Sequence, residues 1–275
     1  MTLETAPTQF VEVAGTPFAH RKLGPRDGTP LVCLQHFSGT MDGWDPAVVN
    51  ALAKDRPVIV FNNTGLGHSS GTTPDNVAQM AADAARFIAA LHFSKVDLLG
   101  YSLGGMIAQV LAAEHAKLVR KLLLVGTAPQ GGEEHLMQVL KEAQSHEEAP
   151  DPRLPLFFTP SAASQAAGVA FLKRASARTA DRDPDSGQAI MGQQAKAIIG
   201  WCATKDPSNR ILGAISQPVL IVSGSNDTML PDSNAYFMFK HLKNAQLILY
   251  PDAGHGALFQ YPKRFVGHVG RFLAE

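Results

Sequence analysis

Short, continuous runs of apolar residues alternate along the chain with segments whose apolar residues recur at helical spacing. The predicted strands are Phe10–Val13, Pro17–Leu23, Leu31–Gln35, Val58–Phe61, Val96–Tyr101, Leu122–Gly126, Val219–Ser223 and Leu247–Tyr250. The predicted helices are Pro46–Lys54, Asn76–His92, Leu103–His115, Asp232–Leu242 and Pro262–Leu273. Continuous apolar strands separated by helices are typical of a parallel sheet that is covered on both faces. The pattern therefore predicts an α/β fold with a mostly parallel, doubly wound sheet of about eight strands.

The middle of the chain breaks this alternation. Residues 130–207 contain several prolines and charge runs, followed by helical spacing without a convincing strand. We interpret them as a helical cap inserted after the sixth strand, between a first core part, 1–129, and a second, 208–275. An insertion at this point would overhang the strand ends where open α/β sheets bind ligands. A disordered linker is the alternative, and the apolar content argues against it: Leu136, Met137, Val139, Phe171, Leu172, Ile198, Ile199 and Trp201.

Composition narrows the classes of protein that remain. The 275 residues are 45% hydrophobic, and 24 basic residues balance 24 acidic ones, so neither nucleic acid nor an anionic membrane surface is an expected partner. The amino-terminal segment lacks the apolar core of a signal peptide, and no apolar run is long enough to cross a bilayer. Two widely separated cysteines, Cys33 and Cys202, fit a reducing compartment. A cytoplasmic protein is expected, and the pattern leaves the oligomeric state open.

The most informative motif is the pentapeptide Gly100-Tyr101-Ser102-Leu103-Gly104, which follows a predicted strand and opens a predicted helix. It matches the G-x-S-x-G nucleophile elbow in the required strand–turn–helix context. The sharp turn brings strand and helix so close that the flanking positions must lack side chains. Ser102 would then lie at a helix N-terminus, where N–H groups favour developing negative charge. The alternative is a turn serine that caps the helix.

A serine hydroxyl needs a base to become a good nucleophile, and the base needs an acid that orients it. His255 lies between two glycines in a loop after the last predicted strand, and Asp227 follows the strand before it. Asp227 could also be an ordinary turn residue. The order Ser102, Asp227, His255 along the chain nevertheless reproduces a serine–acid–histidine arrangement at strand ends. Asp252 is a poorer choice of acid because it is too close to His255 in sequence.

These motifs resemble those of the α/β-hydrolase fold superfamily over nearly the whole chain, and in particular its small cofactor-free serine esterases and the perhydrolases once called non-haem haloperoxidases. The segment "PLVCLQHFSGTMDGW" resembles the family's third-strand segment, and counting back from Trp44 places His36 where the family has a glycine. The resemblance implies that the backbone N–H groups of Phe37 and Leu103 form the oxyanion hole. It also implies a catalytic triad of Ser102, Asp227 and His255.

The resemblance has one clear departure. The turn "FNNTGLGHSSG" resembles the family's Asp-x-Arg-Gly-x-Gly-x-Ser turn, but Asn62 and Thr64 replace the acid and the arginine. We expect this change to affect how the loop is anchored and not the catalytic set.

The expected function is hydrolysis of a small or medium carboxylic ester, or a lactone, through an acyl-enzyme on Ser102. The substrate is expected to be a small molecule, held in an apolar pocket that includes His36, Tyr101, Trp201 and Met229. Neither a metal nor an organic cofactor is expected, because the chain has no HExxH, CxxC or Walker motif. Three alternatives stay open: perhydrolysis, carbon–carbon bond hydrolysis with the same triad, and a binding protein that retains the site without turnover.

Overall fold

A single eight-stranded sheet forms the centre of the molecule in a computed structural model, which describes residues 1–131 and 151–275. The strands are β1 (Gln9–Val13), β2 (Thr16–Leu23), β3 (Leu31–Leu34), β4 (Val58–Phe61), β5 (Val96–Tyr101), β6 (Val119–Val125), β7 (Val219–Gly224) and β8 (Ala245–Tyr250). Their order across the sheet is β1-β2-β4-β3-β5-β6-β7-β8. Only β2 runs antiparallel to its neighbours, β1 and β4, and all other described pairs are parallel. The prediction of a mostly parallel α/β sheet is confirmed.

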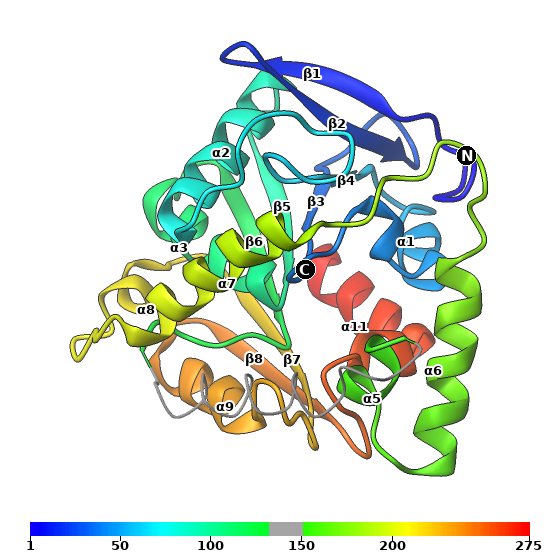
Figure 1. Cartoon of the computed structure of the whole chain (residues 1–275). Helices are drawn as coiled ribbons and strands as arrows, with labels where there is room; N and C mark the ends of the chain where they lie inside the picture. The colour runs from blue at the N-terminus through cyan, green and yellow to red at the C-terminus, as the bar shows by residue number, and fades with distance from the viewer. Residues whose placement is uncertain (132–150) are drawn as a thin grey trace.

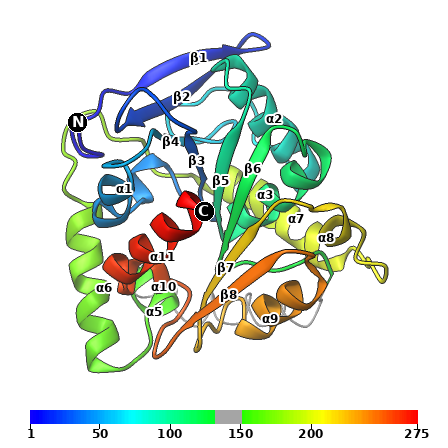
Figure 2. The ribbon, with the colours of Figure 1, turned by 180° about the vertical axis from the view of Figure 1, so that it is seen from behind.

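Helices cover both faces of this sheet, as Figure 1 and its reverse view in Figure 2 show. The described helices are η1 (Met41–Gly43), α1 (Pro46–Leu52), α2 (Val77–Ala90), α3 (Leu103–Glu114), α5 (Arg153–Phe157), α6 (Ala162–Ala175), α7 (Gln188–Ala203), α8 (Arg210–Ala214), α9 (Asp232–His241), α10 (Ala257–Gln260) and α11 (Pro262–Ala274). On one face α2, α3, α8 and α9 pack together with α7, and on the other α1, α10 and α11 pack with α6. None of the described helices is long and apolar enough to span a bilayer.

Alternation along each strand supplies two hydrophobic cores. In β3, for example, Leu31 and Cys33 belong to the core beneath α1 and α11, whereas Val32 and Leu34 belong to the core beneath α2 and α3. Successive side chains of a strand point to opposite faces, so a strand covered on both faces is apolar throughout. This explains why the buried strands appear in the sequence as continuous apolar runs.

Most predicted elements agree with the structure to within two residues at each end, and β6 is the main exception. It begins at Val119 and not at Leu122. Arg120 and Lys121 resemble a solvated loop in the sequence, but the Arg120 guanidinium pairs with Asp97 of β5 at 2.6 Å. The Lys121 Nζ donates to the carbonyl oxygen of Phe272 at 2.6 Å. These partners, one in the sheet and one in α11, satisfy both side chains, so the strand starts three residues earlier. The short helix α10 was not predicted.

Helices α5, α6, α7 and α8 lie between β6 and β7 in the chain, within and just after the range in which a helical cap is expected. The first apolar residues of that expected cap, Leu136, Met137 and Val139, lie outside the described residues. The cap boundaries of 130 and 207 stay a prediction.

The turn that departs from the family pattern is anchored by a residue from this insertion. The Asn62 side chain accepts the N–H of Met41 at 2.8 Å and donates to Asp183 Oδ1 at 2.6 Å. Thr64 donates its hydroxyl to Asp83 at 2.6 Å. The carboxylate that Asn62 lacks is therefore supplied by Asp183, 121 residues later in the chain. Burial, with neighbouring Asp42, raises the pKa of Asp183.

Candidate active site

Ser102 occupies a strained turn between β5 and α3. Its backbone lies at φ 56° and ψ −120°, a conformation that non-glycine residues adopt at a cost of about 1–3 kcal/mol. A Cβ added at Gly104 would overlap the carbonyl oxygen of Leu34 in β3, and one added at Gly100 would overlap the backbone of Gly104. Glycine at both positions is thus required by close approach of strand and helix. The serine is fixed by two further bonds, from its N–H to Val125 O (2.9 Å) and from the hydroxyl of Thr127 to its carbonyl (2.8 Å).

His255 and Asp227 form a buried pair at the same edge of the sheet. His255 Nδ1 lies 2.8 Å from Asp227 Oδ2, and the two side chains are 1% and 0% exposed. The other carboxylate oxygen of Asp227 accepts the N–H groups of Met229 and Leu230, both at 2.9 Å. An ionised carboxylate cannot donate, so Nδ1 carries the proton and Nε2 is left as the acceptor. This is the tautomer that a general base requires.

The His255 ring lies beside the strand that holds Ser102. Gly126 directly follows Val125, whose carbonyl oxygen accepts the Ser102 N–H. A Cβ atom added at Gly126 would lie 3.4 Å from Nδ1 and Cε1 of the His255 ring. Tyr101, directly before Ser102, has its ring centre 5.2 Å from that of His255, and its hydroxyl donates to His255 O at 3.3 Å. Within residues 1–131 and 151–275 the Ser102 hydroxyl makes no hydrogen bond. Such bonds are often open in a ligand-free site and form when substrate binds.

The backbone donors assigned to the oxyanion hole have no competing acceptor in the described part of the chain. Leu103 is the first residue of α3, so its N–H has no partner from a preceding turn of the helix. Phe37 lies in a tight turn after β3, between His36 and Gly39, and Gly39 N–H donates to His36 O at 3.1 Å. The Phe37 side chain is half-buried. These two N–H groups follow the ends of the adjacent parallel strands β3 and β5, and their role as an oxyanion hole stays a prediction.

His36 supports this turn. Its Nδ1 lies 2.7 Å from the carbonyl oxygen of Phe37, and since a carbonyl only accepts, Nδ1 is the donor. Burial lowers the pKa of His36 to about 3, so the ring is neutral at neutral pH. Its Nε2 is buried and has no partner among the described residues. The ring packs edge-on against Tyr101 and Phe157, at centroid distances of 5.3 and 5.4 Å.

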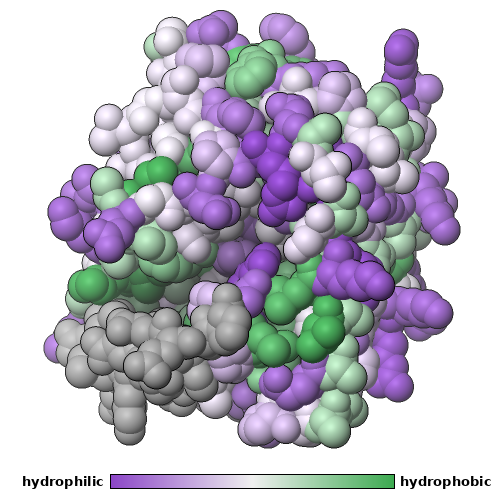
Figure 3. Space-filling model, turned by 45° about the vertical axis from the view of Figure 1, so that its right-hand side comes forward, coloured by the Kyte–Doolittle hydropathy of each residue, from purple (hydrophilic) through white to green (hydrophobic). Residues whose placement is uncertain are grey.

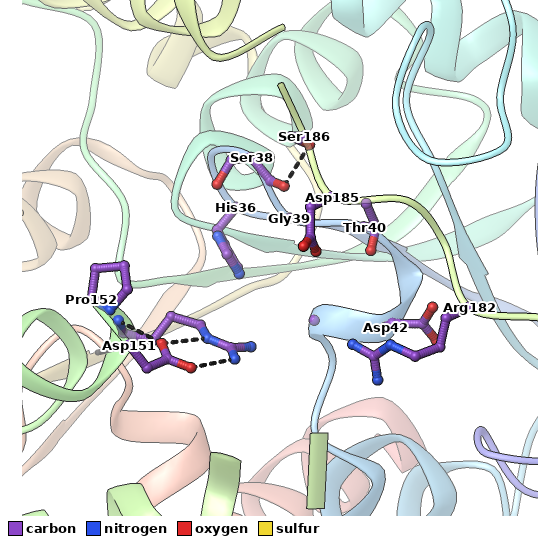
Figure 4. Close-up of a pocket in the computed structure, with 12 residues that line it drawn as sticks. His36, Ser38, Gly39, Thr40, Asp42, Asp151, Pro152, Arg182, Asp185 and Ser186 are labelled. Atoms are coloured by element: carbon purple, nitrogen blue, oxygen red, sulfur yellow. Dashed lines mark hydrogen bonds and ion pairs between the residues drawn. The ribbon is translucent and has the colours of Figure 1, made fainter. Parts of the chain in front are cut away.

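A polar cavity of about 380 Å³ adjoins the other side of this turn. Figure 4 shows Asp151 on one side of the cavity and Arg182 on the opposite side, with His36, Ser38 and Asp185 between them. Its remaining lining residues are Gly39, Thr40, Asp42, Gly43, Pro152, Arg153 and Ser186. Ser102 is not among the residues that line it. The cavity that borders His36 is therefore lined by charged and polar residues, and the apolar substrate pocket expected from the sequence stays a prediction.

A family model described as "alpha/beta hydrolase fold" matches residues 29–262, which include all of these groups. The chain belongs to the α/β-hydrolase fold family. A solved structure, "Alpha/beta hydrolase fold protein from Chitinophaga pinensis", is 44% identical and covers 99% of both chains with a TM-score of 0.94.

Two curated α/β-hydrolase relatives carry more specific names. A "Putative carbamate hydrolase RutD" from Rhizobium rhizogenes is 26% identical over 263 residues, 90% of this chain and 93% of its own. A "Pimeloyl-[acyl-carrier protein] methyl ester esterase" from Nitrosomonas europaea is 28% identical over 251 residues, 87% of this chain and 94% of its own. The family and these relatives support a hydrolase.

The residues expected to line the substrate pocket differ in how deeply they are buried. Tyr101 is fully buried beside His255, and burial, with a smaller effect of Asp227, raises the pKa of its hydroxyl. Trp201 is also buried, in the core on the α2 and α3 side, where its indole N–H donates to Ala128 O at 3.2 Å. Met229 is half-buried beside Asp227 and is the best placed of the three to border the site. Tyr101 and Trp201 are interior residues because their rings complete the two hydrophobic cores.

Two features near His255 were not predicted. Phe157 of α5 packs edge-on against the His255 ring, with 5.6 Å between the centroids, and its carbonyl accepts the N–H of Gly256 at 2.8 Å. Asp252 accepts the hydroxyls of Thr159 and Ser161, both at 2.6 Å, and these bonds lower the pKa of Asp252. Asp252 thus holds the segment before α6 and does not contact the His255 ring. In the sequence, only the aromatic content of the insertion indicates the contact of Phe157 with His255. No local pattern indicates the hydrogen bonds of Asp252.

Proposed function

We propose that the chain is a serine hydrolase that cleaves small or medium carboxylic esters, or lactones, through an acyl-enzyme on Ser102. The observation that carries this proposal is the 2.8 Å pairing of His255 Nδ1 with Asp227, next to a serine held at φ 56° in a nucleophile elbow. The pairing leaves Nε2 as the only ring atom that can take a proton. The esterase name of one relative supports the choice of ester over other acyl bonds.

Acylation begins when the Ser102 oxygen attacks the ester carbonyl while His255 Nε2 accepts the hydroxyl proton. The carbonyl double bond opens, and the N–H groups of Phe37 and Leu103 stabilise the oxyanion. The positive charge on the His255 ring is stabilised by Asp227, which remains ionised. The tetrahedral intermediate then expels the alcohol, which takes the proton from Nε2, and Ser102 is left acylated.

Deacylation repeats these steps with water as the nucleophile. His255 removes a proton from the water, which attacks the acyl carbonyl, and the same two N–H groups bind the second oxyanion. Collapse of this intermediate breaks the bond to Ser102, whose oxygen regains its proton from His255. No net change in protonation or oxidation state occurs, so the cycle needs only the substrate and water.

The surface of the protein favours freely diffusing substrates and does not favour aggregated lipids. On the face drawn in Figure 3, apolar side chains gather in small groups with hydrophilic side chains between them. Three of the large apolar residues that are exposed in the described chain lie on α9, and the others are spread over further elements: Met1, Phe10, Val169, Ile199, Tyr236, Phe237, Phe239 and Leu249. Docking onto a lipid surface depends on a contiguous apolar face. We therefore expect esters with short acyl groups to be better substrates than long-chain lipids.

The test is a panel of p-nitrophenyl acetate, p-nitrophenyl butyrate, a lactone and an aryl carbamate, assayed with wild type and Ser102→Ala. Wild type should hydrolyse at least one ester or lactone and react with a fluorophosphonate at Ser102, and Ser102→Ala should do neither. Full turnover by Ser102→Ala would refute the proposal. If only the carbamate is hydrolysed, the proposed substrate class changes from an ester to another acyl bond.

Two further results would indicate a function other than ester hydrolysis. Bromination in the presence of acetate and peroxide, without ester hydrolysis, would indicate perhydrolysis. Labelling of Ser102 without product release from any substrate would indicate a binding protein.

A further inference from the structure

The turn that carries the Phe37 N–H has a defined type. The Gly39 N–H donates to His36 O, so Phe37 and Ser38 are the two central residues of a β-turn. Ser38 has φ 59°, whereas Phe37 is not among the residues with positive φ. A negative φ followed by a positive φ is the signature of a type II turn, in which the second central residue is usually glycine. A serine at this position is sterically unfavourable and needs support from its surroundings.

Type I and type II turns differ by a flip of the central peptide, here the one that joins Phe37 to Ser38. Both polar ends of this peptide are held by side chains. The Phe37 carbonyl accepts from His36 Nδ1 at 2.7 Å, and the Ser38 N–H donates to Gln194 Oε1 at 2.6 Å. The next carbonyl, that of Ser38, accepts the hydroxyl of Ser186 at 2.8 Å, a bond drawn in Figure 4.

Gln194 comes from α7, 156 residues away along the chain. Its side chain is completely buried, so water does not replace its oxygen as an acceptor when the bond is lost. Its Nε2 is buried and has no partner among the described residues, so the amide makes one bond and leaves its donor unpaired. Burying an unpaired donor is unfavourable. The one hydrogen bond that the Gln194 side chain makes among the described residues is therefore the bond to the Ser38 N–H.

We propose that Gln194 is a positioning residue for the oxyanion hole. Resting on the proposed function, the inference is that its bond to the Ser38 N–H fixes the type II turn and thereby holds the Phe37 N–H where the oxyanion forms. Loss of the bond releases the turn from α7, so the whole turn can shift and carry the Phe37 N–H, which belongs to the preceding peptide, out of place. Displacement of a catalytic group by about 1 Å costs up to about 100-fold in rate, and complete loss of an oxyanion donor costs about 100- to 1,000-fold in kcat.

The variants follow from the chemistry of the bond. Gln194→Met keeps the length of the side chain but removes the acceptor, and Gln194→Glu keeps an acceptor oxygen for the Ser38 N–H. The matched control is Gln193→Met, the neighbouring glutamine on α7, which makes no hydrogen bond to the turn in the described chain. Ser186→Ala removes the outer bond, to the Ser38 carbonyl, and serves as a milder second variant if Gln194→Met fails to fold.

The expected result for Gln194→Met is a 10- to 100-fold lower kcat for p-nitrophenyl acetate with KM changed less than about threefold. The affinity for an alkyl trifluoromethyl ketone, which forms an oxyanion on the serine, should fall in parallel. Gln194→Glu should restore most of the loss, and Gln193→Met should match wild type. A merely structural role would lower the melting temperature without this split between kcat and KM.

Hydrogen exchange supplies a readout that does not depend on catalysis. The Ser38 amide should exchange faster in Gln194→Met than in wild type or Gln193→Met, because its acceptor is gone. Active wild type together with an equally active Gln194→Met would overturn the positioning role and leave the proposed function intact. If faster Ser38 exchange accompanies a wild type that cleaves no acyl substrate, the proposed function fails, and the catalytic part of this inference fails with it.

Discussion

Replacing Asp227 with asparagine is expected to disable the site through the histidine tautomer. Asp227 Oδ1 accepts two backbone N–H groups, from Met229 and Leu230, and these donors will hold the oxygen of the asparagine in the same place. The asparagine NH2 group then faces His255 Nδ1, which must become an acceptor to pair with it. The ring proton moves to Nε2, where it blocks transfer from Ser102.

The magnitude follows from the loss of the base. A wrong tautomer in an otherwise intact triad costs about 10⁴-fold in kcat, or about 5.5 kcal/mol of transition-state stabilisation. The measurement is kcat for p-nitrophenyl acetate at neutral pH, with the melting temperature as a check on folding. Asp252→Asn is the control, because Asp252 contacts Thr159 and Ser161 and not the His255 ring. Residual activity above a tenth of wild type in Asp227→Asn, or an equal loss in Asp252→Asn, would refute the reasoning.

Two further predictions concern stability. Gly104→Ala should lower the free energy of unfolding by about 3 kcal/mol, because the new methyl meets the carbonyl of Leu34. Gly192→Ala on α7, where nothing lies within 4 Å, should raise it by about 1 kcal/mol, and equal effects in denaturant titrations would contradict the packing argument. His36 has a folded-state pKa of about 3 against an ordinary value of 6.5 for the unfolded chain, so its stabilising effect is complete above pH 6.5 and is lost as pH falls toward 3. Relative to His36→Asn, whose amide can still donate to Phe37 O, wild type should lose about 3 kcal/mol between pH 7 and pH 4, and parallel pH curves would contradict this.

The sequence alone predicts the parts of the fold that depend on local pattern. The boundaries of β4 and β5 agree with the prediction, because a strand buried on both faces needs apolar residues throughout. The elbow glycines at 100 and 104 were predicted for the same reason that the structure gives, which is close approach of backbone. Asp227 and His255 could be chosen because each follows a strand, and parallel strands bring their carboxyl ends to one edge.

Contacts between distant side chains could not be predicted in this way. Gln194 is one of two adjacent glutamines, and only the packing of α7 decides that its oxygen, and not that of Gln193, reaches Ser38. Asp183 replaces a carboxylate missing from the turn at Asn62, but it lies in a different part of the chain. The early start of β6 has the same origin, because the ion pair of Arg120 forms with the neighbouring strand. Residues that are polar and buried are placed by partners that no local pattern reveals.

The central claim is that the Ser102 oxygen forms a bond with the acyl group of the substrate. The most direct measurement is intact-mass and peptide mapping of wild type quenched in acid within its first turnovers of p-nitrophenyl acetate. We expect one acetyl group, located on Ser102, that disappears as substrate is exhausted and is absent from Ser102→Ala. Steady release of p-nitrophenol without any acetyl group on Ser102, or with an equal adduct in Ser102→Ala, would contradict the account.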